Sequence, residues 1–114
     1  MEKVVINIAK DFSPTPGPRY THEGKHSGED FRKTVLFPRV KSALDSNSAI
    51  EVQLDGTAGY GTSFLEESFG GLIRIHGLPY NRIKELLTLV SKEEDYLIDD
   101  INEYLNDAHE EQSK

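Results

Sequence analysis

The clearest hydrophobic pattern in the chain lies in residues 49–54, where every second residue is apolar. A period of two predicts a half-buried β-strand. Three glycines follow within residues 56–61, and glycine permits the sharp turns and positive φ angles of a tight loop. Apolar residues then recur at helical spacing over about residues 62–75, up to Gly77. We therefore predict a strand, a glycine-rich turn and a helix in succession.

Thr62 and Ser63 stand at the junction between this turn and the helix. A hydroxyl there can cap the first helical turn. A phosphate there would meet free backbone N–H groups and the positive end of the helix dipole. The two hydroxyls therefore fit either ordinary helix caps or a phosphorylation switch. Phe64 and Phe69, at helical spacing, are interpreted as core residues in preference to residues that stack on a ligand.

The N-terminal third of the chain predicts a strand, a rigid connection and a long helix. A β-branched run predicts a first strand over about residues 3–10. Three prolines within residues 14–18 exclude helix and central strand, and residues 19–22 are predicted to form a short second strand. Ser27 is the expected cap of a helix that closes at residues 45–48. Pro38 lies within it and predicts a kink near Leu36 and Phe37.

The C-terminal part predicts a short helical turn at residues 80–84 and a last strand at residues 86–90, although a helix continuing through that run competes with the strand. Ser91 and Glu94 form a second capping box, which predicts an amphipathic helix followed by a frayed tail at residues 110–114. Alternating strands and helices indicate one small α/β domain, residues 1–109. Its sheet is expected to be mixed, with about four strands, and to be covered by helices.

Composition narrows the class of protein. The 114 residues suffice for one domain, and the formal net charge of −7 argues against non-specific nucleic-acid binding. The absence of cysteine excludes disulfides, thiolate zinc sites and a cysteine nucleophile, and it fits a cytoplasmic location. No apolar run approaches the roughly 18 residues of a membrane span, and the N-terminal residues lack the layout of a signal peptide. We therefore expect no membrane association.

Charge is distributed unevenly along the chain. Residues 1–45 carry eight Lys/Arg and six Asp/Glu, whereas residues 46–114 carry five and fourteen. The acidic excess lies mainly in the last helix, where it is most simply a solvated face. The basic half includes side chains that could frame an anion, although solubility explains them about as well: Arg19, His22, Lys25, His26, Arg32 and Lys33. Arg19 follows the rigid proline loop, and guanidinium binds carboxylate or phosphate through paired hydrogen bonds, yet turns of this composition are also common without function.

No catalytic or metal-binding arrangement stands out. His22, Glu23, His26 and Asp30 are close in sequence, but the two histidines flank a glycine in a loop and do not share a helix face. The glycine turn lacks the Lys-Ser/Thr of a phosphate-binding loop, and Ser63 is followed by Phe-Leu, which does not match a nucleophile elbow. We therefore predict a non-enzymatic protein with no metal and no cofactor.

Four ordered segments resemble the bacterial STAS-like domains of unknown function. They are residues 9–12 (Ala-Lys-Asp-Phe), 16–19 (Pro-Gly-Pro-Arg), 27–32 (Ser-Gly-Glu-Asp-Phe-Arg) and 55–71, within which Gly-Tyr-Gly-Thr-Ser-Phe-Leu-Glu-Glu at residues 59–67 is the most specific. The resemblance runs from about residue 6 to residue 74 and continues loosely to the end. It implies a small α/β regulatory domain in bacteria.

A more distant resemblance is to anti-sigma-factor antagonists, the founding STAS proteins. These bind a histidine-kinase-like ATPase that acts as a serine kinase, and they are switched by phosphorylation at an Asp-Ser-Ser-Gly-Leu motif. The resemblance places the phosphoacceptor at Thr62 and the neighbouring hydroxyl at Ser63. The sequence departs from the motif at Gly61, in place of aspartate, and at Phe64, in place of glycine. STAS-like domains also tend to be encoded beside ATPases of the histidine-kinase type.

Together these features predict a non-enzymatic regulatory module that binds a protein partner, a histidine-kinase-like ATPase, through residues 59–64 and the first turn of the following helix. The expected binding residues are Arg19, Gly59, Tyr60, Gly61, Thr62, Ser63 and Phe64. One alternative is a sensor of a small anionic ligand or nucleotide, held by Arg19, Thr62 and Ser63. A weaker alternative is a hydrolase that uses Ser63.

Overall fold

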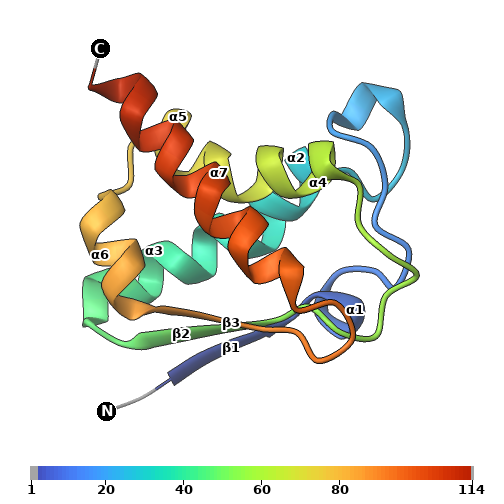
Figure 1. Ribbon diagram of the computed structural model, residues 1–114, viewed down its shortest axis with the longest axis horizontal. Helices are drawn as coiled ribbons and strands as arrows, with labels where there is room; N and C mark the ends of the chain where they lie inside the picture. The colour runs from blue at the N-terminus through green and yellow to red at the C-terminus, as the bar shows by residue number, and fades with distance from the viewer. Residues whose placement is uncertain (1–2, 114) are drawn as a thin grey trace.

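Three parallel strands form the sheet of the domain (Figure 1). The structure is a computed structural model that describes residues 3–113, so residues 1–2 and 114 lie outside the described residues. The strands are β1 (Lys3–Asn7), β2 (Ala49–Gln53) and β3 (Leu87–Val90), in the order β1-β2-β3. Their register aligns Ile6 with Val52 and Val52 with Leu89, which makes a row of buried apolar side chains on one face.

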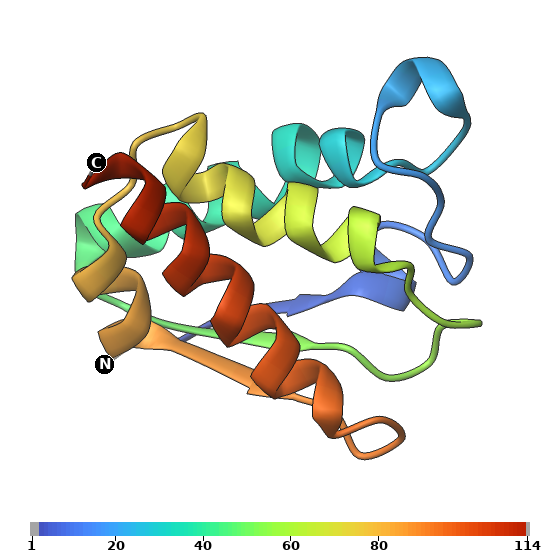
Figure 2. The ribbon, with the colours of Figure 1, turned by 45° about the horizontal axis from the view of Figure 1, so that its top comes forward.

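The helical segments lie on that apolar face, as Figures 1 and 2 show. A continuous helical stretch comprises α2 (Gly28–Phe31), the π-helical turn η2 (Arg32–Leu36) and α3 (Phe37–Ser46). A second comprises α4 (Thr62–Leu65), the π-helical turn η3 (Glu66–Gly70) and α5 (Gly71–Arg74). The remaining helices are α1 (Ile8–Asp11), the 3₁₀ turn η1 (Thr21–Glu23), α6 (Tyr80–Leu86) and α7 (Tyr96–Gln112).

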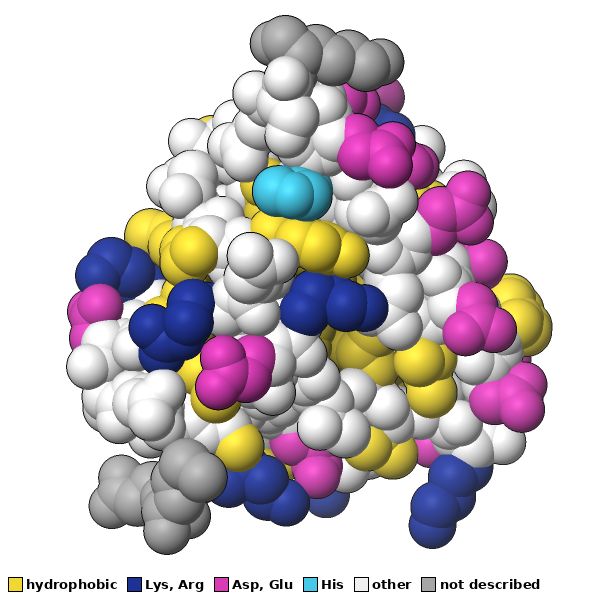
Figure 3. Space-filling view, turned by 60° about the vertical axis from the view of Figure 1, so that its left-hand side comes forward, with side chains coloured by type: hydrophobic (Ala, Val, Ile, Leu, Met, Phe, Trp, Pro, Cys, Tyr) yellow, Lys and Arg dark blue, Asp and Glu magenta, His cyan; other side chains and the backbone are white. Residues whose placement is uncertain are grey.

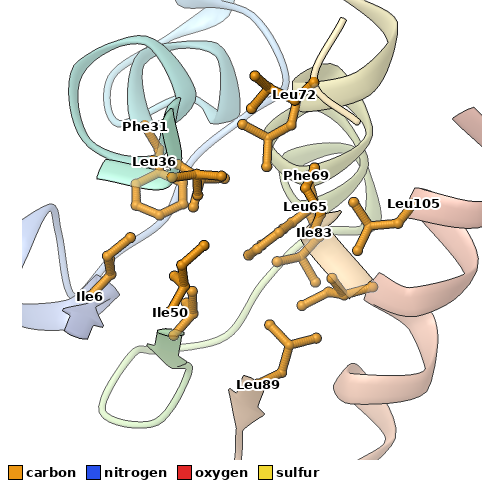
Figure 4. Packing of buried hydrophobic residues seen from close by; sticks show 14 of the residues in the cluster. Ile6, Phe31, Leu36, Ile50, Leu65, Phe69, Leu72, Ile83, Leu89 and Leu105 are labelled. Carbon is orange, nitrogen blue, oxygen red and sulfur yellow. The ribbon is translucent and has the colours of Figure 1, made fainter. Parts of the chain in front are cut away.

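The core lies between the sheet and these helices. Figure 4 shows Ile6, Ile50 and Leu89 of the sheet pointing toward Phe31, Leu65 and Leu105 of the helices. The opposite face of the sheet carries the exposed Val5 (45%) beside Glu51, which accepts hydrogen bonds from Lys3 (3.0 Å) and Gln53 (2.6 Å). Parallel sheets are usually covered on both faces. This one has a single covered face, and β2 accordingly alternates buried and half-buried residues.

The α/β class and the strand at residues 49–54 are confirmed, but the expected sheet of about four mixed strands is wrong. The described residues form three strands, all parallel. Residues 19–22, for which we predicted a strand, lead into η1, where the backbone N–H of Tyr20 donates to Glu23 (2.9 Å). The first strand ends at Asn7, because its side chain accepts a hydrogen bond from the N–H of Lys10 (3.1 Å) and thereby starts α1.

The distortion expected around Pro38 is present as the π-helical turn η2, which ends at Leu36. Proline has no N–H to donate to the carbonyl one turn earlier, so the regular hydrogen-bond ladder is interrupted before it. The second π-helical turn, η3, contains no proline and was not predicted. Both π-helical turns lie where the two long helical stretches face each other.

The C-terminal elements follow the predicted order. The strand predicted at residues 86–90 is present as β3 (Leu87–Val90), and the competing helix α6 ends at Leu86. Ser91 accepts a hydrogen bond from the N–H of Glu94 (3.1 Å), as a capping residue does, although α7 begins only at Tyr96. The helix extends to Gln112, into the segment expected to fray, and the side chain of Gln112 donates to the carbonyl of Ile73 (2.8 Å). Within residues 3–113 no helix combines the length and apolarity needed to cross a bilayer.

Most acidic side chains on the face in Figure 3 lie along its right-hand side. Exposed carboxylates of α7 and its N-cap residue contribute much of the acidic character of the C-terminal half: Asp95, Asp99, Glu103, Asp107, Glu110 and Glu111. They occupy the solvent side of the helix, because Leu97, Ile101 and Leu105 fill the opposite side. The acidic excess is thus a solvated helix face, as the sequence indicated.

Candidate functional site

The glycine-rich turn connects the end of β2 to the start of α4. Gly56 and Gly59 have φ angles of 92° and 135°, values that side chains with a Cβ disfavour. The hydroxyl of Tyr60 donates to the carbonyl of Leu54 (2.7 Å), which fixes the turn to the end of the strand. Burial raises the pKa of Tyr60 to about 12, so the hydroxyl keeps the proton that it donates. The backbone N–H of Ala58 donates to Pro14 (2.8 Å), which ties the turn to the proline loop.

Thr62 and Ser63 lie exposed at the first turn of α4. Gly61, which has no side chain, is the N-cap of the helix. Neither hydroxyl forms a hydrogen bond with any residue in the range 3–113. The interpretation of these residues as ordinary caps therefore does not hold, since a cap residue accepts a hydrogen bond from the N–H groups of the first turn.

Phe64 is fully buried and belongs to the core, as its spacing predicted. Its ring lies 5.8 Å from that of Phe31, 5.9 Å from that of Tyr60 and 6.3 Å from that of Phe12. A Cβ added at Gly28 would lie 2.5 Å from the Phe64 carbonyl oxygen, so α2 and α4 touch through their backbones here. Phe64 thus positions the junction from beneath and offers no surface to a partner.

Arg19 lies beside the second turn of the helix. Its Nη1 donates to Glu66 (2.6 Å) and to Glu67 (3.3 Å), so its charge is paired with carboxylates of the protein itself. Arg74 pairs with Glu66 from the other side (2.9 Å). Burial acts to raise the pKa of Glu66, but the hydrogen bonds from Arg74 and Arg19 outweigh it and hold that pKa below its usual range.

Arg32 and Glu67 form a buried ion pair that the sequence did not reveal. Arg32 was considered as a side chain that could frame an anion, but it is 1% exposed, and its Nη1 donates to a carboxylate oxygen (2.5 Å) and the carbonyl (2.8 Å) of Glu67. A Cβ added at Gly71 would lie 2.6 Å from that Nη1, so the guanidinium occupies the space that this glycine leaves. The Gly70-Gly71 pair inside a helical pattern was the signal for such a close approach.

His76 completes this buried network. Its Nε2 accepts a hydrogen bond from Nε of Arg32 (3.3 Å), and its ring stacks on Phe37 with centroids 3.8 Å apart. Burial, with the nearby charges of Arg32 and Lys33, lowers the pKa of His76, so the neutral ring that can accept this hydrogen bond is favoured.

The side chains that were considered for a metal or an anion are dispersed. His22 stacks on Tyr20, whereas Nδ1 of His26 lies 3.2 Å from the buried Ser13 hydroxyl. Lys33 pairs with Glu29 (2.9 Å). Within residues 3–113 no three histidine, aspartate or glutamate side chains converge as a metal site requires. Of the basic residues of the N-terminal half, Arg19 and Arg32 meet at the Glu67 carboxylate, whereas His22, His26 and Lys33 have other partners.

Residues 27–97 match the family model described as "STAS-like domain of unknown function (DUF4325)". The match covers both helical stretches, β2, β3 and the junction at Thr62 and Ser63. No curated protein matches the chain. No solved structure matches it either.

Proposed function

The chain belongs to the family of STAS-like domains of unknown function, and on that premise we propose that it is a non-enzymatic regulatory module that binds another protein. The proposed partner is a histidine-kinase-like ATPase, in keeping with the resemblance to anti-sigma-factor antagonists. The observation that carries the proposal is the exposed junction at the start of α4. There Gly61, Thr62 and Ser63 lie open to solvent on a turn that Tyr60 and the proline loop hold in place.

The topology supports recognition on a surface in preference to recognition in a cleft. Open α/β sheets bind small ligands where the strand order reverses, because a crevice opens there between helices on opposite faces. The order β1-β2-β3 has no reversal, and the helices lie on one face. Residues 3–113 form no detectable pocket. A partner would therefore contact the junction from outside.

The contacts of Arg19 and Ser63 favour this function over the two alternatives. The predicted sensor of an anionic ligand relies on Arg19, but the charge of Arg19 is paired with Glu66 and Glu67. A serine hydrolase needs a base hydrogen-bonded to its nucleophile. Ser63 Oγ has no such partner among the described residues.

The proposal also includes a regulatory step, the phosphorylation of Thr62 or Ser63 at the junction. A phosphate on Thr62 or Ser63 adds about −1.5 to −2 charges at neutral pH. The helix N-terminus offsets part of that charge, by roughly 0.3–1 kcal/mol when exposed, so the domain stays folded while its surface changes sign. The exposure of both hydroxyls gives a kinase access to either one.

The test is to mix the chain with a histidine-kinase-like ATPase, the partner that the resemblance implies, with and without ATP. Binding is measured by calorimetry and phosphosites by mass spectrometry. Thr62→Ala and Ser63→Ala are compared with Thr88→Ala, an equally exposed threonine on the polar face of the sheet. We expect the junction variants to bind at least about tenfold more weakly than Thr88→Ala, or to lose the phosphosite. Full binding by both junction variants with no phosphate found would remove the junction from the mechanism.

A further inference from the structure

Seven consecutive residues, 20–26, form a projecting loop that we call the finger. Every one of them is exposed. In Figures 1 and 2 the finger is the light-blue segment that projects beyond the helices, at the end of the molecule where α4 begins. The match to the family model starts at residue 27, directly after it. The finger is thus an appendage to the matched part of the fold.

The finger is held at its base by backbone hydrogen bonds. The N–H of Gly17 donates to His26 (2.8 Å), that of Gly28 donates to Pro18 (2.8 Å) and that of Glu29 donates to Arg19 (3.0 Å). His26 has a left-handed backbone conformation, with φ of 58°, which turns the chain back toward its base.

Further hydrogen bonds fix the interior of the finger. Thr21 donates to Glu29 through its N–H (2.9 Å) and to Asp30 through its hydroxyl (3.0 Å). An ordered exposed loop has already lost the conformational entropy that a flexible loop loses on binding. The finger is therefore pre-organised for contact with another surface.

An aromatic pair occupies the finger. Tyr20 is 40% exposed, and its ring stacks on that of His22 with centroids 5.5 Å apart and planes 12° apart. The guanidinium of Arg19 lies 5.9 Å from the centre of the Tyr20 ring. Tyrosine supplies a large contact area at a low entropic cost and is enriched among residues that dominate binding energy. The pair is outside the core, so its exposed rings are available to a partner.

The charge of the finger identifies the chemistry of that partner. Glu23 and Lys25 are its charged residues, and neither takes part in an ion pair within residues 3–113. The Glu23 carboxylate is held within the finger by the hydrogen bond from the N–H of Tyr20, whereas the Lys25 side chain has no such bond among the described residues. Lys25 is exposed and therefore presents an unpaired cation in the same loop as the aromatic pair. A complementary surface offers an apolar pocket for the tyrosine and a carboxylate at its rim.

We propose that the finger is a second docking element for the protein partner of the junction, with Tyr20 as its aromatic anchor and Lys25 facing an acidic side chain. This inference rests on the proposed function, since it assumes that a partner occupies the junction. Arg19 places the two elements beside each other, because it adjoins the finger and pairs with Glu66, one turn into the helix that starts at the junction.

The test measures binding of the histidine-kinase-like ATPase to Tyr20→Ala and Lys25→Glu proteins. Two controls match them. Tyr96→Ala removes an exposed tyrosine (56%) on α7, and Lys84→Glu reverses an exposed lysine on α6. We expect Tyr20→Ala to raise Kd at least about tenfold and Lys25→Glu to raise it several-fold, with a weaker dependence on salt. Each control should change Kd less than about twofold.

The outcomes separate the two proposals. Finger variants that bind as tightly as their controls, in a chain that otherwise binds, would overturn the finger and leave the junction standing. A wild-type chain that does not bind the ATPase would overturn both. The melting temperatures of all variants are compared. If Tyr20→Ala lowers the melting temperature, the binding of Lys25→Glu tests the finger instead. The Lys25 side chain forms no ion pair within the described residues, so its replacement should leave the fold intact.

Discussion

Removing one partner of the Arg32–Glu67 pair should destabilise the domain far more than removing both. Arg32 is 1% exposed and Glu67 is 4% exposed, so neither charge has access to water if the other is lost. In Glu67→Leu the guanidinium keeps only the Glu67 carbonyl and the ring of His76 as acceptors. In Arg32→Met the carboxylate keeps only Arg19, at 3.3 Å.

The magnitude follows from desolvation. Breaking a buried pair by removing one member costs about 3–5 kcal/mol, because an uncompensated charge stays in a low-dielectric environment. Replacing both members by apolar residues of similar volume is often neutral or stabilising by about 1–4 kcal/mol. We expect Arg32→Met and Glu67→Leu each to lower the free energy of unfolding by about 3 kcal/mol. The double variant should recover most of that loss.

The assay is urea unfolding followed by circular dichroism, with the slope m checked for constancy so that a shift in midpoint reports stability. Asp45→Asn is the matched control, because it breaks the exposed Lys41–Asp45 pair (2.7 Å) and should cost under about 0.5 kcal/mol. A single variant that loses less than about 1 kcal/mol would refute the reasoning. So would a double variant less stable than either single one.

Two further predictions concern packing and pH. Gly71→Ala should lower the free energy of unfolding by about 1–3 kcal/mol, because its Cβ would lie 2.6 Å from the buried Arg32. The control is Gly61→Ala, whose Cβ meets open space and which should change the free energy of unfolding by under about 0.5 kcal/mol. Urea unfolding measures both. The ion pairs of Glu66 lower its pKa, so they stabilise the fold above about pH 4.5 and that stability is lost as pH falls through the lower folded-state pKa. Acid titration should show a smaller loss below pH 4.5 for Glu66→Gln, and equal losses in both proteins would contradict this assignment.

The sequence predicted the elements whose signals are local. The alternation at residues 49–54 and the helical spacing after residue 62 each lie within one element, so the strand, the turn and the helix were found close to their true bounds. Ser27 was identified as a cap, and its hydroxyl does accept a hydrogen bond from the N–H of Asp30 (3.0 Å). The prolines likewise predicted the connection without helix or strand at residues 14–18 and the helix distortion before Pro38.

Features that depend on contacts between distant segments were not predictable in this way. Periodicity does not say which strands pair or in what direction, so the three parallel strands were missed. Arg32 occupies a polar position on its helix, but it is buried because Gly71 leaves room for it and Glu67 compensates its charge. The hydroxyls of Thr62 and Ser63 fitted caps by sequence, but the chain places Gly61 at the N-cap.

The charges around the junction also indicate how the two proposed docking elements would influence each other. A phosphate on Ser63 would precede Glu66 and Glu67 by three and four residues, the spacings at which helical side chains are neighbours. The two carboxylates would repel the phosphate, and Arg19 already forms ion pairs with both carboxylates. The same arginine adjoins the finger and lies near the ring of Tyr20. A new negative charge at the junction would therefore act first on the pairing of Arg19, and through it on the base of the finger.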